Sequence, residues 1–394
     1  MSGLLKLLDL PREEKEARGL LYTPQEIAQQ PVTWRLTLRY FKENQQRIRG
    51  FLENTGVTSQ LEQRPTVVLT GAGTSDYIGQ SLTLLIRQRW GCEVLPIASP
   101  DLLSSLEDYV VPGRRYLWIS FSRSGDSPEG VAVLEQALNL FPEVSHVVVT
   151  CNPRSRMFEI GERDDRVLVA VLDDSVNDRG LAMTSSFTNM IVFGQCLAHA
   201  WSMEEYVPVL DVMVSAGESF LTSASQAAMA LAERRFSRMC FVGSGALAAV
   251  ARESGLKVLE MSGGRVKTMF ETVLGLRHGP MAALDTETLF VCFVSAEQRR
   301  QQYEIDLLRE VEAKGIVKSS IAIGPESARV SVAPASEYYL PIQGEMADMY
   351  RPPVDVIFGQ LLGLYCSLEH GMKPDAPSPG GVISRVVQDF RIYR

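Results

Sequence analysis

Serines gather at the end of one apolar run, in the stretch YLWISFSRSGDSPEG at residues 116–130. Directly after the run come three serines, an arginine and a glycine: Ser122, Arg123, Ser124, Gly125 and Ser127. Glycine allows a tight backbone turn, and hydroxyls beside the free N–H groups of a helix N-terminus can hold a phosphate. The stretch therefore predicts either a phosphate-binding loop or a serine-rich turn in which Ser127 simply caps a helix.

A second glycine-rich loop, TGAGTSDYIG at 70–79, follows another apolar run and also carries hydroxyls. Gly73 precedes Thr74 and Ser75, and a predicted helix follows with Ser75 as its N-cap. The loop is not a dinucleotide fingerprint, because Asp76 stands at the third glycine position. It is not a Walker A loop either, because no Gly-Lys-Ser/Thr follows. Two such loops after two buried strands favour an anion site.

Candidates for acid–base chemistry lie further along the chain. Glu253, Lys257 and Glu260 recur at one-turn spacing on a predicted helix, so their side chains share a face. His278 lies in the loop GLRHGP and is one of four histidines in the chain. An imidazole with its ordinary pKa of ~6.5 exchanges protons near neutral pH. The alternatives are a solvated ion-pair face and a structural loop histidine.

Composition restricts the class of protein. The 394 residues are 45% hydrophobic and 22% charged, and the interspersed charges sum to −8, which argues against nucleic-acid and anionic membrane partners. The six cysteines are far apart, so no zinc-like spacing occurs. The N-terminus lacks a signal-peptide pattern, and the most apolar helical stretch, 190–201, is too short to span a bilayer. We therefore expect a cytoplasmic protein.

Short β-branched runs alternate with helical segments along most of the chain. Strands are predicted at 66–73, 93–97, 116–121, 146–151, 166–172, 287–295, 319–324 and 336–342. Helices are predicted at 75–90, 127–141, 186–203, 297–315 and 354–371, the last two with Gly315 and Gly371 as C-caps. Residues 237–264 read as a strand, a glycine turn and a long helix. This alternation predicts an α/β fold with parallel sheets covered on both faces.

Both halves of the chain begin with a strand, a Gly-x-Gly turn and a helix, at Gly71/Gly73 and Gly243/Gly245. The second turn, GSGALA, also fits G-x-G-x-x-A, so dinucleotide binding and a tight packing turn are both open there, although no clear acidic strand end follows. The repeated pattern predicts two similar domains, at 51–210 and 211–372, with a linker near 204–220.

The chain has an expected helical arm at 1–50 and a Pro- and Gly-rich tail at 373–394. In the arm, TPQEIAQQPVTW predicts a helix with Thr23 as N-cap, Pro24 at the first position and Glu26 at the third. The tail turns apolar and basic toward its end, so we expect it to pack back on the body, over the active site.

Taken together, GAGTS, SRSGDS, ARESGLKVLE and RHGP resemble the SIS (sugar isomerase) family in order and approximate spacing. The resemblance covers nearly the whole chain as two tandem SIS domains, each a doubly wound sheet of flavodoxin-like order. The chain looks like the isomerase half of glucosamine-6-phosphate synthase. Through DRGLAMTSS, LGLRHGP and the PSPGGVISRVVQ tail, it is more similar still to AgaS-type galactosamine-6-phosphate deaminase/isomerases.

The resemblance implies a role for each matching residue. Phosphate would be held by the two hydroxyl-rich loops, that is, by Gly73, Thr74, Ser75, Ser122, Arg123, Ser124 and Ser127. Glu260 would move a proton between C1 and C2, Lys257 would steady the open-chain oxygens, and His278, in this family sometimes from a neighbouring subunit, would open the ring. The segment from Asp178 through Arg179 and Ala182 to Met183 would line the sugar.

The chain departs from the synthase at two positions. Arg385 stands where the synthase has a tail lysine, and Arg123 stands where it has glutamine, which leaves the roles of both open. No glutamine-hydrolysing domain is recognised, since about 50 residues precede the first SIS domain.

The implied reaction converts galactosamine 6-phosphate to tagatose 6-phosphate and ammonia, with no metal or organic cofactor. A tagatose-6-phosphate ketose/aldose isomerase and a glucosamine-6-phosphate deaminase are the alternatives. A non-catalytic phosphosugar sensor is disfavoured, because the catalytic Glu and His are both present. A borrowed His278 would require at least a homodimer.

Overall fold

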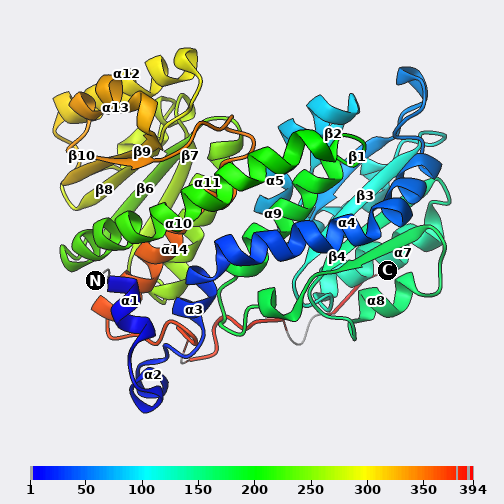
Figure 1. Ribbon diagram of the computed structural model, residues 1–394, viewed down its shortest axis with the longest axis horizontal. Helices are drawn as coiled ribbons and strands as arrows, with labels where there is room; N and C mark the ends of the chain where they lie inside the picture. The colour runs from blue at the N-terminus through cyan, green and yellow to red at the C-terminus, as the bar shows by residue number, and fades with distance from the viewer. Residues whose placement is uncertain (1–2, 379, 388–390, 394) are drawn as a thin grey trace. The chain divides into compact units, whose positions relative to one another are not determined.

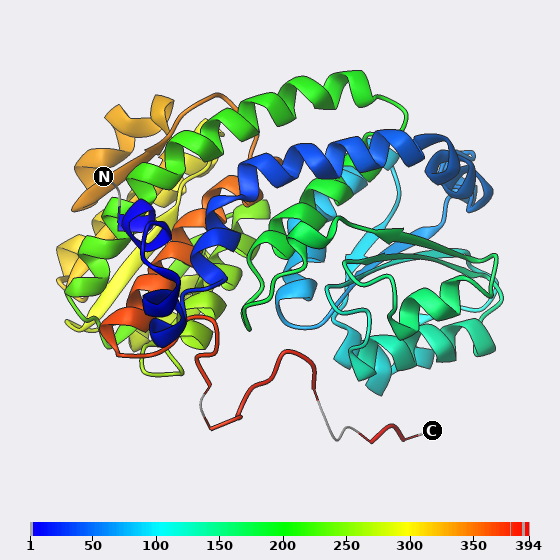
Figure 2. The same cartoon turned by 60° about the horizontal axis from the view of Figure 1, so that its bottom comes forward.

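The computed structural model describes residues 3–378, 380–387 and 391–393. They group into two compact units, each built around one five-stranded parallel sheet (Figures 1 and 2). Unit 1 contains the residues up to 32, residues 178–184 and residues 208–382. Unit 2 contains residues 33–177, residues 185–207 and the residues from 383 onward.

The sheet of unit 2 has the flavodoxin-like order that the family resemblance implied. Its strands, in spatial order, are β2 (Val94–Pro96), β1 (Thr66–Thr70), β3 (Tyr116–Ser122), β4 (Val144–Thr150) and β5 (Val167–Val171). Every neighbouring pair is parallel. Because β1 and β3 are buried along their whole length, they appear in the sequence as continuous apolar runs rather than as alternating patterns.

Helices cover both faces of this sheet (Figure 1). On one face lie α5 (Thr74–Trp90) and α9 (Ser185–Ala198), and all of α9 is buried. On the other lie α6 (Ser99–Ser104), α7 (Pro128–Leu140) and α8 (Arg156–Gly161). Their apolar side chains pack with Val68 and Trp118 in one cluster and with Val148 and Val169 in another.

The sheet of unit 1 repeats the same order. Its strands are β10 (Tyr338–Ile342), β9 (Ser319–Pro325), β8 (Thr288–Phe293), β6 (Arg238–Gly243) and β7 (Lys267–Thr272), all parallel. Two helices, α11 (Ala246–Met261) and α14 (Pro352–Glu369), pack together on one face. On the other face, α12 (Gln298–Lys314) and α13 (Arg329–Val332) pack on a core that includes Cys240, Phe290 and Leu307 (Figure 1).

The remaining helices are α1 (Gly3–Leu8), α2 (Arg12–Arg18), α3 (Thr23–Ala28), α4 (Gln30–Asn54) and α10 (Met203–Glu233). Short 3-10 turns are η1 (Leu61–Gln63), η2 (Leu106–Tyr109), η3 (Asp174–Val176), η4 (Gly275–Arg277), η5 (Pro280–Ala283), η6 (Glu326–Ala328) and η7 (Ala333–Ala335). No helix in the described part of the chain is long and apolar enough to cross a membrane.

Several local predictions need correction at helix ends. Thr23 is not an N-cap, because Tyr22 holds that position and Thr23 is the first residue of α3. Ser75 lies inside α5, whose N-cap is Gly73. His370 stands at the C-cap of α14, one residue before the predicted Gly371. Each predicted cap residue thus lies one or two positions from the observed cap, which is the range within which helix ends are commonly misassigned.

Two longer features also differ. Residues 204–220, expected as a linker, are helical and belong to the 31-residue helix α10, which tolerates Pro208 near its first turn. The division between the two units falls within this stretch, between residues 207 and 208. Strand β7 was missed, because its partly exposed residues, KTMFET, form no continuous apolar run. The predicted tail includes residues 379, 388–390 and 394, which lie outside the described residues.

Buried His146 gives unit 2 a dependence on pH. The ring lies edge-on to Trp118 at 5.7 Å, and neither ring nitrogen has a hydrogen-bond partner among the described residues. Burial, with a smaller effect from Arg166, lowers the pKa of His146 to about 3. The folded state therefore keeps this imidazole neutral at pH values where the unfolded chain binds a proton.

Because the folded pKa lies below the unfolded one, stability from this group is complete above pH ~6.5 and is lost as the pH falls. We expect the wild type to lose about 2 kcal/mol of unfolding free energy between pH 7 and pH 5 through His146. Urea unfolding at both pH values should show a correspondingly smaller loss for His146→Phe. His278→Phe, at an exposed site, is the control and should retain the wild-type dependence.

Candidate functional site

The order of the strands brings the two hydroxyl-rich loops to one place. In unit 2, β1 and β3 are neighbours, with Thr70 beside Ser120. After β1 the chain passes through α5 to β2, and after β3 it passes through α7 to β4, so the two connections run to opposite sides of this pair. Ligands of such folds bind at the carboxyl ends of strands where the order reverses. The loops 71–74 and 122–127 both leave β1 and β3 at this edge, so the sequence prediction of one shared anion site fits the topology.

The loop after β3 is held by the segment that follows β4. Backbone N–H groups of Cys151 and Met157 donate to the carbonyls of Arg123 and Gly125, both at 3.1 Å. Gly125 has a φ of +64°, and an added Cβ would lie 2.2 Å from the Ser155 hydroxyl. The turn thus requires glycine, both for its backbone conformation and for space.

The serine side chains of this loop hold its backbone in part. The Ser122 hydroxyl accepts from the Gly125 N–H at 3.1 Å, and the Ser124 hydroxyl accepts from the Asp126 N–H at 3.2 Å. Ser127 stands at the N-cap of α7, as predicted, but its side chain makes no capping bond. Ser122 and Arg123 are buried, whereas Ser124 and Ser127 are partly exposed. Hydroxyls that stiffen a turn can also donate outward, since each has one donor and two acceptor positions.

The loop after β1 is equally constrained. An added Cβ on Gly71 would lie 2.6 Å from Ser75, so the turn into α5 is closed to any larger residue. Gly73 has a φ of +57° at the N-cap, and the next two residues, Thr74 and Ser75, are buried in the first turn of the helix. The N–H groups of Ser75 and Asp76 donate to the carbonyls of Ala72 and Gly73, at 3.1 and 3.0 Å, so the turn is bonded within itself. The positive end of the helix dipole still suits an anion there.

The corresponding loops of unit 1 are occupied by carboxylates of the chain itself. After β8, Asp348 accepts from the Ser295 hydroxyl at 2.5 Å and from the Ala296 N–H at 2.7 Å. Arg300 and Arg351 donate to the same carboxylate at 2.9 and 3.3 Å. Glu304 accepts from the Ser295 N–H at 2.9 Å. This occupancy favours the loops of unit 2 as the site for an external anion.

The predicted acid–base residues come together on α11 of unit 1. Lys257 is fully buried, contacts Glu260, and lies 3.4 Å from a Glu253 oxygen. Burial lowers the pKa of Lys257, but the charges of Glu253 and Glu260 outweigh burial, so the pKa is raised and the ammonium stays charged. Glu253 is also fully buried, whereas the Glu260 side chain keeps 23% of its surface exposed. Glu260 can therefore reach a substrate while Lys257 stays covered.

Close packing of α14 fixes the position of α11. An added Cβ on Gly359 would lie 2.2 Å from the Ser254 hydroxyl, and one on Gly363 would lie 2.9 Å from the Lys257 carbonyl. Glycine at both positions lets the two helices approach closely beside the buried lysine. The position of Lys257 thus depends on a helix about 100 residues further along the chain.

The structure does not join His278 to this group by a described contact within the chain. His278 follows η4 in the loop after β7 and is exposed. Its backbone N–H donates to Gly275, and Gly279 beside it has a φ of +121°.

The predicted sugar-lining segment and the tail arginine have their own contacts. Asp178 and Ala182 are buried and Arg179 is exposed. Asp178 accepts from the N–H and hydroxyl of Thr184 at 2.8 and 3.0 Å. Arg385 donates to the Asn177 side chain at 2.7 Å, a contact within unit 2.

Two groups escaped the sequence analysis. Asp348 lies in a loop without any motif, and its role depends on strand order. Glu26 was noticed only as a helix-start residue, although its carboxylate contacts residues about 150 positions away. No local signal could have found either contact.

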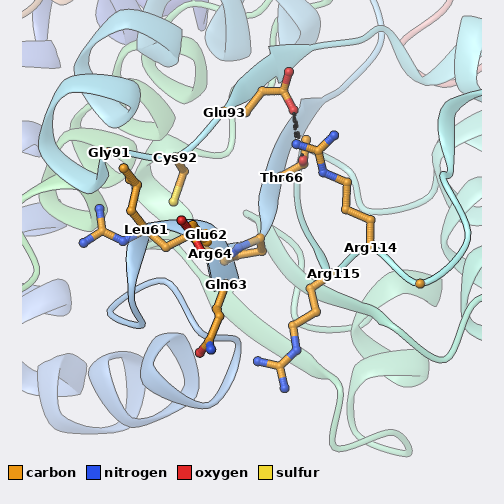
Figure 3. A pocket seen from close by; sticks show the side chains of 12 residues that line it. Leu61, Glu62, Gln63, Arg64, Thr66, Gly91, Cys92, Glu93, Arg114 and Arg115 are labelled. Carbon is orange, nitrogen blue, oxygen red and sulfur yellow. Dashed lines mark hydrogen bonds and ion pairs between the residues drawn. The ribbon is translucent and has the colours of Figure 1, made fainter.

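A cavity of about 670 Å³ lies elsewhere in unit 2 (Figure 3). Its lining includes Arg64, Thr66, Glu93, Arg114 and Arg115, at the amino ends of the strands. In Figure 3, Glu93 bonds Thr66 and Arg114 at one side of the cavity. It contains none of the predicted site residues. The described residues also include no group of three or more potential metal ligands.

Comparisons with known proteins place this chain among sugar-phosphate enzymes. It is 33% identical over 380 residues to D-galactosamine-6-phosphate deaminase AgaS of Escherichia coli O157:H7, covering 94% of this chain and 95% of that protein. It is 30% identical over 387 residues to the protein of the same name from Shewanella sp. strain ANA-3, covering 98% and 95%. The crystal structure of tagatose-6-phosphate ketose/aldose isomerase from Escherichia coli matches with a TM-score of 0.82 and 32% identity, over 93% of this chain and 96% of that one. No family model matches.

The carboxylate in the unit 1 loop leads to a test by chemical rescue. Asp348→Ala would leave Ser295, Ala296 and buried Arg351 without their shared acceptor, so we expect a loss of about 3 kcal/mol in unfolding free energy. Millimolar acetate or phosphate should restore thermal stability to this variant far more than to the wild type. Asp285→Ala, which removes an exposed partner of Arg238, is the control and should show no selective rescue. An equal gain in thermal stability from acetate or phosphate in wild type, Asp348→Ala and Asp285→Ala would show that the Asp348 carboxylate does not fill an anion site.

Proposed function

The chain belongs to the AgaS family of D-galactosamine-6-phosphate deaminases, and we propose that it converts galactosamine 6-phosphate to tagatose 6-phosphate and ammonia. The conversion needs a group that opens the sugar ring, a base that moves a proton from C2 to C1, and a positive charge near the open-chain oxygens. Water then adds to the resulting C2 imine and releases ammonia, which leaves the ketose phosphate.

The observation that carries this proposal is the buried Lys257 beside Glu260, whose side chain keeps 23% of its surface exposed. Glu260 takes the C2 proton and returns it to C1, which one carboxylate can do from a single face of the sugar. Lys257, held charged by Glu253 and Glu260, lies beneath the surface and supplies the positive charge that steadies the open-chain oxygens without touching them. His278 opens the pyranose ring, and its exposed imidazole is available to a substrate or to another copy of the chain.

The phosphate is assigned to the hydroxyl-rich loops of unit 2. Thr74, Ser75, Ser122, Ser124 and Ser127 supply hydroxyls, and the N-terminus of α5 supplies the positive end of its dipole. Asp178, Arg179 and Ala182 line the sugar. Arg385 contributes a positive charge from the tail, where it bonds the Asn177 side chain.

A plain tagatose-6-phosphate ketose/aldose isomerase is the second candidate. It is favoured by the similarity to the Escherichia coli structure of that name. The two reactions share the proton transfer at C1 and C2 and differ only in whether a nitrogen leaves. Ammonia release is therefore the measurement that separates them.

The proposal also includes the cellular compartment and the oligomeric state of the enzyme. All six cysteines are free and buried, as expected for a reducing compartment such as the cytoplasm. An exposed His278 supports a homo-oligomer in which one copy completes the site of another. The division into two SIS domains, at 51–210 and 211–372, and a tail that packs over the active site belong to the same proposal.

The first test is ammonia release from galactosamine 6-phosphate and, separately, from glucosamine 6-phosphate. We expect release from the galacto sugar. Release from the gluco sugar alone would change the substrate, and release from neither would move the function to the plain isomerase.

The second test is Glu260→Gln, which keeps the shape of the side chain but removes the base. We expect ammonia release to fall about a thousandfold, while binding of the sugar phosphate, measured by calorimetry, stays within a few-fold of wild type. Glu312→Gln, an exposed site on α12, is the matched control and should retain full activity. Undiminished turnover in Glu260→Gln would rule out this mechanism.

A further inference from the structure

The carboxyl group of Glu26 is buried against a segment far away in the sequence. Glu26 lies in α3 and is only 6% exposed. One of its oxygens, Oε1, accepts from the backbone N–H groups of Arg179 and Gly180, at 2.5 and 3.2 Å. A carboxyl group that accepts from two consecutive backbone N–H groups fixes the direction of that backbone. Residues 178–184 are the segment to which the proposed function assigns sugar contacts, and they belong to unit 1 with α3.

The rest of the segment is tied down in the same way. Leu181 N–H donates to the Asp375 carbonyl at 3.0 Å, and Thr184 N–H donates to Asp178 at 2.8 Å. Asp375 in turn accepts from the Leu21 and Thr23 N–H groups at 2.7 and 2.8 Å, which joins it to the start of α3. The segment, α3 and Asp375 therefore form one hydrogen-bonded cluster.

Gly180 shows how closely the segment approaches α3. A Cβ added there would lie 2.9 Å from the Thr23 hydroxyl and 3.0 Å from the second Glu26 oxygen. Only a residue without a side chain lets the backbone come this near. The contact between Glu26 and the segment is thus part of the packed interior of unit 1.

We propose that Glu26 is a positioning residue that holds residues 178–184 in the conformation in which they line the sugar. It touches the backbone of the segment and acts on the reaction through it. The effect of this role on catalysis rests on the proposed function. The hydrogen bonds by which Glu26 holds the segment do not depend on that function.

The charges around Glu26 make this hold sensitive to pH. Burial, followed by the charge of Asp178, raises the pKa of Glu26 to about 8, although the N–H groups of Arg179 and Gly180 oppose the shift. Asp375 is the third acidic group that faces it, with a smaller effect in the same direction. Because this pKa lies above that of an ordinary glutamate, the closed cluster loses stability as the pH rises from about 4.5 to about 8, where release of the segment lets Glu26 ionise. Above pH 8 the group ionises in place beside two other carboxylates, and the loss is complete.

Trypsin provides a test that does not require turnover. The exposed Arg179 precedes Gly180, so cleavage after Arg179 reports how often the segment leaves its place. We expect Glu26→Ala to be cleaved there about tenfold faster than wild type at pH 7.5, whereas Glu26→Gln, which keeps a neutral acceptor, should stay close to wild type. Between pH 6 and 8, cleavage of the wild type should accelerate relative to a reference peptide, and cleavage of Glu26→Gln should not.

Kinetics then connect the hold to the reaction. For Glu26→Ala we expect a raised KM for galactosamine 6-phosphate at pH 7.5, and for Glu26→Gln a near-normal KM that does not rise between pH 6 and 8 as that of the wild type does. Glu16→Ala, an exposed site on α2, is the matched control and should resemble wild type in both assays. Circular dichroism checks that every variant is folded.

The outcomes separate this inference from the proposed function. Equal protection of Arg179 in wild type and folded Glu26→Ala would overturn the role of Glu26, whatever the enzyme catalyses. Faster cleavage of Glu26→Ala in a protein that releases no ammonia would support the hold and overturn only the proposed function. Faster cleavage with unchanged KM would confine Glu26 to a structural role and overturn its part in substrate binding.

Discussion

Backbone N–H groups without partners are the constraint around which this chain is organised. Parallel strands and the helices that follow them leave such groups at turns and helix starts, and buried ones must be bonded. The chain meets this need with its own carboxylates at several places, among them Asp348 at the loop after β8, Asp375 before α3, and Glu26 at residues 179–180. The loops after β1 and β3 carry hydroxyls and glycines instead, which suits an external anion that binds reversibly.

The two units share a strand order but use it differently. In unit 1, the loop after β8 bonds Asp348, which pairs with buried Arg351 at the N-cap of α14. Arg351 also pairs with Asp355. Burial raises the pKa of Asp355 to about 6, even beside this arginine, which shows how strongly the interior disfavours charge at that point. A network of this kind loses stability when one partner is removed. The network therefore bonds the polar groups of the loop permanently, and the loop does not serve as a ligand site.

The buried charge on α11 depends on its surroundings in a similar way. Lys257 is tolerated without exposure because Glu253 and Glu260 balance it and because the glycines of α14 allow tight packing beside it. Partly exposed Glu260 is the member of the group that a substrate can reach. Rigid packing on one side and access on the other are what a base of fixed geometry needs.

The sequence by itself determined the strand–helix alternation, the two glycine-turn repeats and the residues with reactive side chains. These features are local: apolar runs mark buried strands, and spacing of three or four residues puts Lys257 and Glu260 on one helix face. Only the tertiary structure decided which backbone groups each carboxylate bonds. Glu26 meets Arg179 across 153 positions, and Asp375 meets Leu21 across 354. Such contacts arise when distant segments pack together, and no local pattern records them. The start of α3 near Thr23 was misplaced for the same reason, because Asp375, which accepts from the Thr23 N–H and hydroxyl, comes from the far end of the chain.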